Sequence, residues 1–453
     1  MDFLDSLVIP QSPDNLILIK FLLGLSWLLL IPFVSVLLGI TTYSIYMNRK
    51  GISEDDQLII SVSNSIIEII TKHKIAWFVL GIIPLLSIGF SYVQLLQGLA
   101  TGISLYIVVA LFLFIDCTIL IFAYQYAFKL KGLFDKVDSG MFNTDGVDED
   151  SKRDIGDYRK RLGSLYSTAS KIGVICLIIT VYLLAVVIDV SYNTSSWNGA
   201  SLLNKMFSLG IIFNFIQFIS AAFAAGSIVV LYYFYRNNSN YKIENAEAAN
   251  TVRNYSLVIS IVFLLVQPIL IVLKIMVLPH AALSYHVFLL GVINLSVVFL
   301  LVHLVYRMLQ DRSLNYSSSL LFVLIFFFTF TVLGDQISFA TAAKKQDNVL
   351  QKEYEAYAVE LDKKLGLGEI VVNGEEVYTR VCSACHQFDK VVVGPAHKDV
   401  LPKYEGKMDD LVAYILDPVK VDPKFTVMPK QAINKEEAEA VAAHLMELYN
   451  SKK

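Results

Sequence analysis

Long apolar runs constrain the fold of this chain more than any other feature of its sequence. A bilayer core about 30 Å thick is crossed by about 20 residues of α-helix, and about eight runs reach that length. They span residues 15–47, 75–99, 101–128, 171–190, 207–235, 255–278, 285–308 and 320–340. Only 17% of the residues are charged, which excludes an ordinary soluble domain. The sequence predicts an all-α fold whose main part is a polytopic bundle of membrane helices.

The positions of lysine and arginine predict the orientation of the bundle. Basic residues gather in the connections after the first, third, fifth and seventh runs, and the alternate connections carry few charges, with Lys205 as the main exception. Because basic connections stay in the cytoplasm, both termini are expected on the outer, periplasmic side of a bacterial inner membrane. A cleavable signal is not expected, since residues 1–14 are acidic and the first run is too long. The basic set comprises Arg49, Lys50, Lys72, Lys74, Lys129, Lys131, Lys152, Arg153, Arg159, Lys160, Arg161, Arg236, Lys242, Arg253, Arg307 and Arg312.

A short motif outside these runs carries the chemistry of the chain. Cys382 and Cys385 are separated by two residues, and His386 follows directly. This is the attachment sequence for a c-type haem, in which each thiol binds one vinyl group and the imidazole ligates the iron. A redox dithiol and half of a zinc site are the alternatives, but the sequence has no second close pair of cysteines to complete a zinc site. We therefore expect one covalent haem c with His386 as its proximal ligand.

The residues around the motif favour the same cofactor. Gly374 and Tyr378 precede Cys382 at helical spacing, as in a first helix that carries its cysteines at the end. Gly394 and Pro395 follow the motif, where a backbone carbonyl can accept the ring N–H of the proximal histidine. Both residues are expected in the haem pocket.

Met428 is the expected distal ligand. It stands in a loop ahead of a helix predicted over 434–449, whose start is marked by Asn434 and Glu437. A His/Met pair raises the haem potential and leaves no open position for a substrate, which favours electron transfer. The rival ligands are Met408, His397 and His444.

With these motifs, the last part of the chain resembles the class I cytochromes c. The resemblance implies a small all-α mono-haem domain, which we expect over 367–453. A charged segment of helical pattern over 344–366 is predicted to tether this domain to the membrane domain, 1–343.

Polar residues inside the apolar runs indicate another candidate site. Asp116 lies in the middle of its run, whereas Asp189 and Asp335 lie toward the outer face. A carboxylate in a membrane span is costly enough to indicate quinol binding, proton transfer or an internal ion pair. For the outer carboxylates the alternative is an ion pair with Lys20 or Lys274. The uncharged polar residues within the runs are Asn214, Gln217, Gln267 and Asn294.

The membrane region distantly resembles subunit I of the cytochrome bd-type oxidases. Its first and fifth runs are alike, each ending in aromatic residues before an arginine, which suggests two four-helix halves. The resemblance would place haem-ligating histidines on these two runs, where this chain has residues such as Leu29, Pro32, Phe213 and Asn214. His303 is the one histidine well inside a run, so a bis-histidine haem b is not expected. The resemblance therefore implies an architecture and no oxygen chemistry.

Two connections between the runs also have predicted structures. Residues 54–71 have an amphipathic helical pattern and are expected to lie in the membrane interface. Residues 132–157 are rich in glycine and aspartate and are expected to form a partly flexible loop.

Together these features predict a membrane-anchored mono-haem c-type cytochrome that passes single electrons in a respiratory chain, as a subunit of a larger complex. The expected partners are membrane lipids, other subunits of the complex, and a soluble or membrane redox protein; nucleic acid is not expected. One alternative is a quinol-oxidising subunit whose membrane domain binds the quinol. The other is a membrane domain that serves only as an anchor or assembly scaffold.

Overall fold

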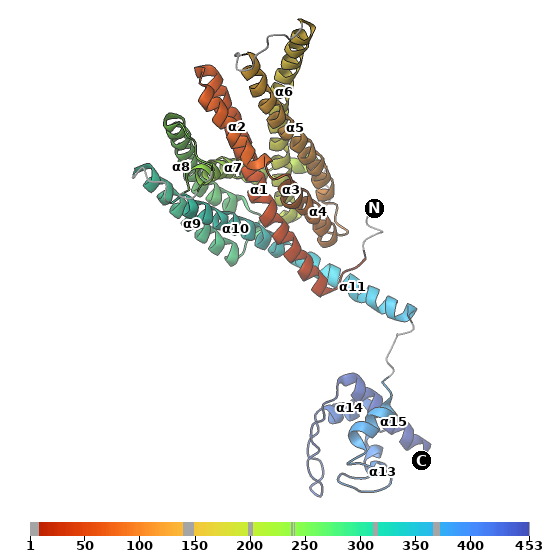
Figure 1. Ribbon diagram of the computed structural model, residues 1–453. Helices are drawn as coiled ribbons and strands as arrows, with labels where there is room; N and C mark the ends of the chain where they lie inside the picture. Colours follow the sequence, from red (N-terminus) through yellow and green to blue (C-terminus); the bar gives the residue numbers. More distant parts are fainter. Residues whose placement is uncertain are drawn as a thin grey trace. The chain divides into compact units, whose positions relative to one another are not determined.

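The computed structural model describes residues 9–138, 149–197, 203–236, 239, 241–310, 316–365 and 372–452. Within these ranges the regular structure is helical and contains no strand, which confirms the all-α prediction (Figure 1). The chain divides into two compact units, Met1–Tyr354 and Glu355–Lys453. Each unit is described separately.

Among the described residues, eight helical segments are long and apolar enough to cross a membrane, one for each predicted run. An α-helix suits such segments because it satisfies every backbone hydrogen bond within the segment. They are α1 (Pro13–Glu54), the second segment formed by α3 (Lys74–Trp77), a π-helical turn (Phe78–Ile82) and α4 (Ile83–Leu95), then α5 (Ile103–Asp138), α6 (Glu149–Tyr192), α7 (Leu209–Tyr235), α8 (Ala246–Val277), α9 (Tyr285–Gln310) and α10 (Ser317–Ala342).

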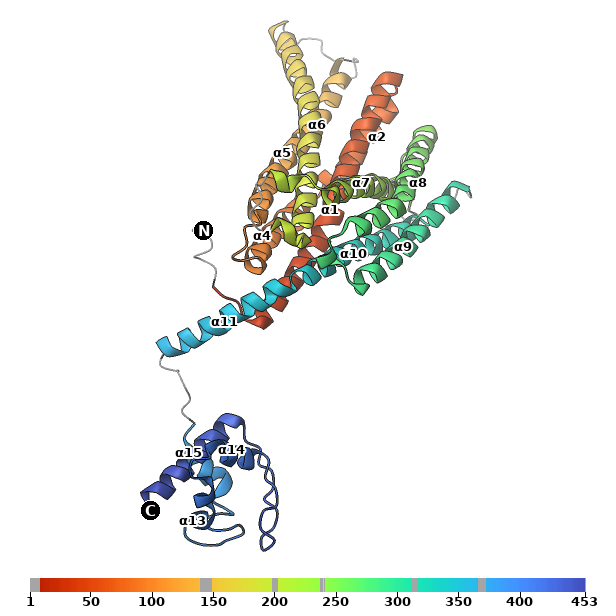
Figure 2. The same cartoon turned by 180° about the vertical axis from the view of Figure 1, so that it is seen from behind.

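The spans form two groups of four that meet along α1 and α7. In the first group α1, α4, α5 and α6 pack in a ring, and in the second α7, α8, α9 and α10 do the same. Figures 1 and 2 show α5 and α6 to one side of α1, with α8, α9 and α10 to the other. This arrangement agrees with the two four-helix halves predicted from the similarity of the first and fifth runs.

Two glycines let α1 and α7 approach until their backbones touch. A Cβ added at Gly39 would meet the carbonyl oxygen of Ala222 and the backbone of Gly226. A Cβ added at Gly226 would meet the backbone of Gly39 in return. Small residues at a crossing allow membrane helices to gain close van der Waals contact, which replaces the hydrophobic driving force that water supplies elsewhere.

The helix predicted over 54–71 is present as α2 (Gln57–Thr71), and its apolar face is buried by protein. α1 ends at the left-handed residue Asp55 (φ 53°), and α2 turns back to pack against α1 and α5. α1 continues past its apolar span and so offers a protein surface to α2, while the position of α2 in the membrane interface stays a prediction. The residues buried there are Ile59, Val62, Ile66, Ile67 and Ile70.

The connection predicted as a loop over 132–157 is partly helical. α5 continues to Asp138 and α6 already begins at Glu149, so both helices extend well beyond one membrane thickness. The remainder of the predicted loop, 139–148, lies outside the described residues.

The stalk predicted after the last span is the helix α11 (Lys344–Lys364), and its first turns pack on the membrane unit. The ammonium of Lys20 pairs with the Asp347 carboxylate at 2.6 Å. The side-chain amide of Gln346 donates to the Gln97 carbonyl at 2.8 Å, and Leu350 is buried. Lys20 therefore does not pair with Asp189 or Asp335, because α11 packs beside α1 and presents Asp347 to it.

Lys205, the exception to the charge bias, is held by the protein. Its side chain is buried in the connection before α7, where the ammonium donates to the carbonyl oxygens of Ala100 and Thr101. Its charge is thereby compensated by backbone dipoles, because a buried cation without partners would be costly.

The second unit is a small helical domain built on α15 (Lys435–Ser451). The helix predicted over 434–449 is confirmed, with Asn434 and Glu437 forming a capping box at its start. A Cβ added at Gly374 would meet the Ala440 carbonyl oxygen, so glycine at this position allows its helix to cross close to α15. The other elements are α12 (Gly374–Val377), a π-helical turn (Tyr378–Cys382), α13 (His397–Val400), a 3-10 turn (Leu401–Tyr404) and α14 (Met408–Leu416).

The contact between α1 and α7 predicts a difference between two glycines of α1. Gly39→Val should lower the stability of the bundle by at least about 1–3 kcal/mol, because the added side chain has no room against the α7 backbone. Gly24→Ala is the matched control, since its Cβ would lie 3.7 Å from the nearest atom, Gln336 Cγ. Thermal unfolding of the purified chain, followed by helical circular dichroism, measures both; equal midpoints would contradict the close packing.

Candidate functional site

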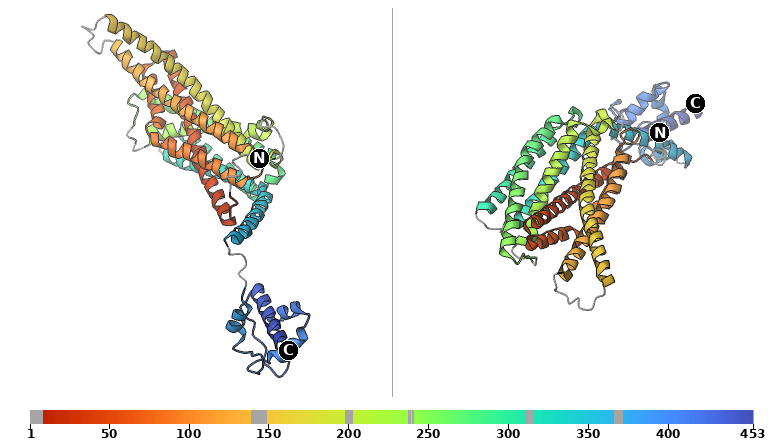
Figure 3. Two further views of the ribbon diagram at one scale, coloured as in Figure 1. Left: turned by 90° about the vertical axis from the view of Figure 1, so that its right-hand side faces the viewer. Right: turned by 90° about the horizontal axis from the view of Figure 1, so that it is seen from above.

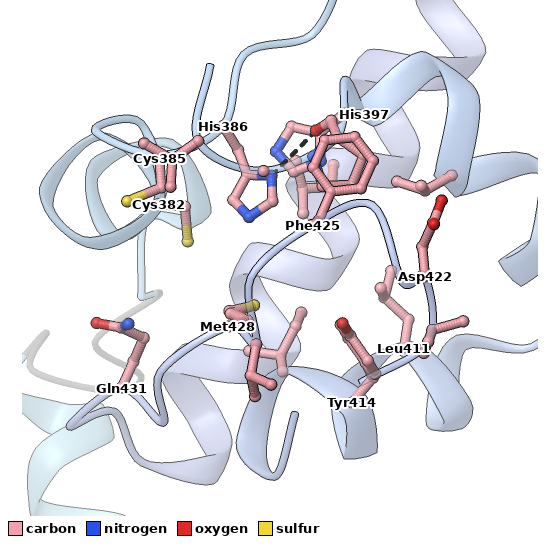
Figure 4. Close-up of a pocket in the computed structure, with 18 of the residues that line it drawn as sticks. Cys382, Cys385, His386, His397, Leu411, Tyr414, Asp422, Phe425, Met428 and Gln431 are labelled. Atoms are coloured by element: carbon pink, nitrogen blue, oxygen red, sulfur yellow. Dashed lines mark hydrogen bonds between the residues drawn. The ribbon is translucent and has the colours of Figure 1, made fainter. Parts of the chain in front are cut away.

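The second unit encloses a cavity lined by both cysteines of the motif, by His386 and by Met428. About 1370 Å³ of space lies between the lining atoms. Figure 4 shows Cys382, Cys385 and His386 on one side of this space and Met428 across from the histidine ring. The structure thus brings together residues that are more than forty positions apart in the sequence.

Backbone groups fix the ring of His386. Its Nδ1–H donates to the Pro395 carbonyl oxygen at 3.1 Å, which directs the other nitrogen, Nε2, into the cavity. The ring also lies against Gly394, where an added Cβ would collide with it. Such a carbonyl partner orients a metal-binding imidazole and selects its tautomer. Gly394 and Pro395 therefore lie where the sequence predicted them, beside the proximal histidine.

The structure also separates the rivals for the distal position. Met408 begins α14, is 42% exposed, and is absent from the cavity lining, as is His444 on α15. His397 does line the cavity, but its ring stacks on His386 with the centroids 5.0 Å apart. It therefore shares the proximal side of the cavity, and the geometry favours Met428 as the residue that faces His386.

The pKa values of Cys382 and His397 do not suit a reactive thiol or a charged imidazole in the cavity. Burial raises the pKa of the Cys382 thiol, and the charge of Cys385 raises it further. A reactive cysteine needs a lowered pKa, so the Cys382 thiol is not poised as a nucleophile. Burial, with the nearby His386, lowers the pKa of His397 to about 4, so His397 is neutral at pH 7. Among the described residues, no group of three or more His, Cys, Asp or Glu side chains is arranged to hold a metal ion.

A comparison with known proteins identifies the family of this unit. An 80-residue stretch of the chain is 40% identical to cytochrome c-551 of Pseudomonas denitrificans, and it covers 96% of that protein. The chain belongs to the cytochrome c-551 family through this domain. The match covers 17% of the chain, and no protein-family model matches. This domain is accordingly of the cytochrome c type, and the residues that line the cavity fit a c-type haem.

The aspartates predicted inside the membrane spans lie in different environments. Lys274 and Asp335 form an ion pair at 2.6 Å with side chains that are 13% and 9% exposed, so one of the alternative pairings from the sequence is confirmed. Asp189 accepts a hydrogen bond from the Ser208 hydroxyl at 2.9 Å. Asp116, by contrast, is exposed on α5, so the structure does not bring the three predicted aspartates into one site. His303 is likewise on the exposed side of α9.

Amide side chains around the Lys274–Asp335 pair form a feature that the sequence alone does not reveal. Gln217 and Asn294 line a small cavity with the pair, and Asn214 lines an adjoining one. Asn294 donates to the Thr331 hydroxyl at 2.9 Å, but its own oxygen has no partner in the described part of the chain. The sequence shows only that these amides lie at similar depths in separate runs. The packing of α7, α9 and α10 is what brings them to one place.

The geometry of the haem cavity predicts different effects for two methionines. Met428→Leu should remove the sulfur ligand and lower the haem reduction potential by on the order of 100 mV, because axial ligands set that potential over a wide range. Met408→Leu is the matched control and should leave the potential unchanged. Redox titration of the haem absorption tests both variants. An unchanged potential in Met428→Leu would exclude Met428 as the distal ligand.

Proposed function

We propose that this protein is a membrane-anchored mono-haem c-type cytochrome that passes single electrons in a respiratory chain. The observation that supports this most directly is the cavity in which Cys382, Cys385 and His386 face Met428. Bound haem supplies a one-electron carrier that alternates between the ferric and ferrous states.

The residues of the cavity have separate tasks in this proposal. The thiols of Cys382 and Cys385 would hold the haem by covalent bonds. His386 would ligate the iron through Nε2, because Nδ1 is engaged by Pro395. Met428 would fill the remaining axial position. With both positions filled by the protein, the site would exchange electrons and exclude a small substrate from the iron.

The proposed location is a bacterial inner membrane with both termini and the haem on the periplasmic side. An even number of spans leaves both ends of the membrane unit on the same side. The bias of lysine and arginine toward the opposite connections supports an external position for those ends. An external position suits the proposed haem, because haem c is attached in that compartment in bacteria.

The chain is proposed to work as a subunit of a larger respiratory complex, among membrane lipids. One haem without a second redox centre makes a poor complete enzyme, because electrons must both arrive and leave. Electrons would enter from a quinol or a partner subunit, and they would leave to a soluble or membrane redox protein.

The proposal predicts one covalent haem that depends on two of the four cysteines. Replacing Cys382 and Cys385 by serine should give a chain with the mass of the bare polypeptide. Replacing Cys117 and Cys176, which lie within α5 and α6, should leave the added mass of one haem. Mass analysis of the denatured chain measures both. The reduced-minus-oxidised spectrum should show c-type bands alone, and a b-type band would contradict the single haem.

The cavity beside Lys274 and Asp335 favours quinol oxidation as a second candidate function. Its lining combines a cation, a carboxylate and amide groups with partly exposed apolar residues, namely Ile275, Leu290, Gly291, Phe330 and Gly334. Exposed apolar residues of a membrane bundle border lipid, which is where a quinol dissolves. A polar pocket with an apolar border suits a headgroup that carries two hydroxyls on an apolar tail.

In this second function the polar groups would orient the quinol and accept its protons. The unpartnered oxygen of Asn294 would accept a hydrogen bond from one hydroxyl, and the Asp335 carboxylate would act as the base. Oxidation of one quinol to a quinone releases two protons and two electrons. One haem takes up one electron at a time, so it would have to pass the first electron to the acceptor redox protein before it could accept the second.

Quinol-driven reduction of the haem in the full chain tests the second function. The double variant Lys274→Gln/Asp335→Asn should slow it by at least about tenfold, because it removes the base without leaving one buried charge unpaired. Gln94→Leu is the control, since Gln94 is also a buried amide with an unpartnered oxygen but lies on α4, away from the cavity. Equal rates in all three proteins would leave the membrane unit as an anchor or scaffold.

A further inference from the structure

Asp116 is a carboxylate without a partner in the middle of a membrane-spanning helix. α5 begins at Ile103, so Asp116 lies about 20 Å along the helix at about 1.5 Å per residue, inside an apolar core about 30 Å thick. Its side chain is exposed, and it forms no hydrogen bond or ion pair with the residues that the structure describes. An aspartate side chain is too short to reach the membrane surface from that depth. Exposure to lipid at this position would be costly for the carboxylate.

The surface around Asp116 is apolar and faces away from the bundle. Phe112 and Ile119, about one turn to either side on α5, are 63% and 61% exposed. Ile172 and Ile175 are exposed on α6, the helix that packs along α5. We call these five residues the Asp116 face. Figures 1 and 3 show α5 and α6 at one edge of the bundle, and the described part of the chain leaves the side chains of the Asp116 face exposed.

The exposed surface of α8 differs from the Asp116 face. The exposed stripe of α8 is wholly apolar and consists of Val258, Val262, Leu265, Ile269, Val272 and Met276. A stripe of this composition suits lipid. The single carboxylate of the Asp116 face does not.

The chain provides partners for its other charged groups at membrane depth. Lys274 pairs with Asp335, and Asp189 accepts from Ser208. Lys171, an exposed cation of α6, lies about 30 Å from the helix end at Tyr192, where its long side chain can reach water. Asp116 therefore differs from them, because it has no partner among the described residues and its short side chain cannot reach water from that depth.

We propose that the Asp116 face binds a transmembrane helix of another subunit, which presents a lysine, an arginine or a hydrogen-bond donor to Asp116. The inference rests on the proposed membership in a complex and specifies the surface and the chemistry of the contact. A carboxylate is acceptor-only when ionised, so its partner must donate. A second copy of this chain docked symmetrically on the same face would oppose two carboxylates, which repel each other. The partner is therefore a different chain.

Photo-crosslinking of the full chain in its native membranes tests the proposal. A photoreactive residue is placed at Phe112 or at Ile119, and in a control protein at Ile269 in the apolar stripe of α8. The adducts are sequenced by mass spectrometry. From the Asp116 face we expect one protein adduct, in an apolar segment that has a basic or donor side chain within a turn of the cross-link. From Ile269 we expect lipid adducts.

A second pair of variants isolates the carboxylate. Asp116→Leu should reduce the yield of the protein adduct by about three- to tenfold, the range for one interhelical hydrogen bond, whereas Asp116→Asn should retain more of it. Adducts with lipid alone, with a second copy of this chain, or with a segment that lacks polar groups would each overturn the proposal. The haem spectrum of the same preparations is recorded alongside. A normal c-type spectrum with lipid adducts alone would reject this inference and leave the electron-carrier function standing.

Discussion

The absence of water in the bilayer core is the constraint on which most of this structure depends. Backbone groups there can be satisfied only within each segment, so the spans are helices, and helices can associate only through close contact and polar bonds. Gly39 and Gly226 provide the contact between the two groups of four helices, and Lys274 with Asp335 provides a polar bond within one of them. The same constraint makes Asp116 notable, because its carboxylate is exposed and has no polar partner among the described residues.

The haem unit is stabilised in a different way, because it is a small domain with a small core. Its buried residues gather on α15 and its neighbours, and the rest of its interior is the cavity between His386 and Met428. A domain of this size buries little apolar surface of its own, so a cofactor that fills the cavity would complete the core. Function and stability would then depend on the same residues. The hydrogen bond from His386 to Pro395 orients the ring by means of the backbone, which a change of side chain alone does not alter.

Much of this architecture could be predicted from the sequence, for reasons that differ from residue to residue. The spans could be predicted because length and hydropathy alone define them, and α15 could be predicted because Asn434 and Glu437 form a local capping motif. The features that could not be predicted concern contacts between distant segments. The burial of α2 depends on how far α1 extends, and the partner of Lys20 depends on the path of α11. The cavity that joins Gln217 to Asn294 is of the same kind, since no local pattern records which helices are neighbours.

The contact between Gly39 and Gly226 also limits which substitutions this chain can accept during evolution. In most packed pairs, a gain of volume on one side is offset when the opposite residue becomes smaller. Here both partners are already glycine, the smallest residue, so neither can shrink to accept a methyl group on the other. A substitution at one position can be rescued only by moving the two helices apart, which would disturb every neighbour of α1 at once. The pair should therefore be among the least replaceable positions in the chain, although it lies far from any redox chemistry in the sequence.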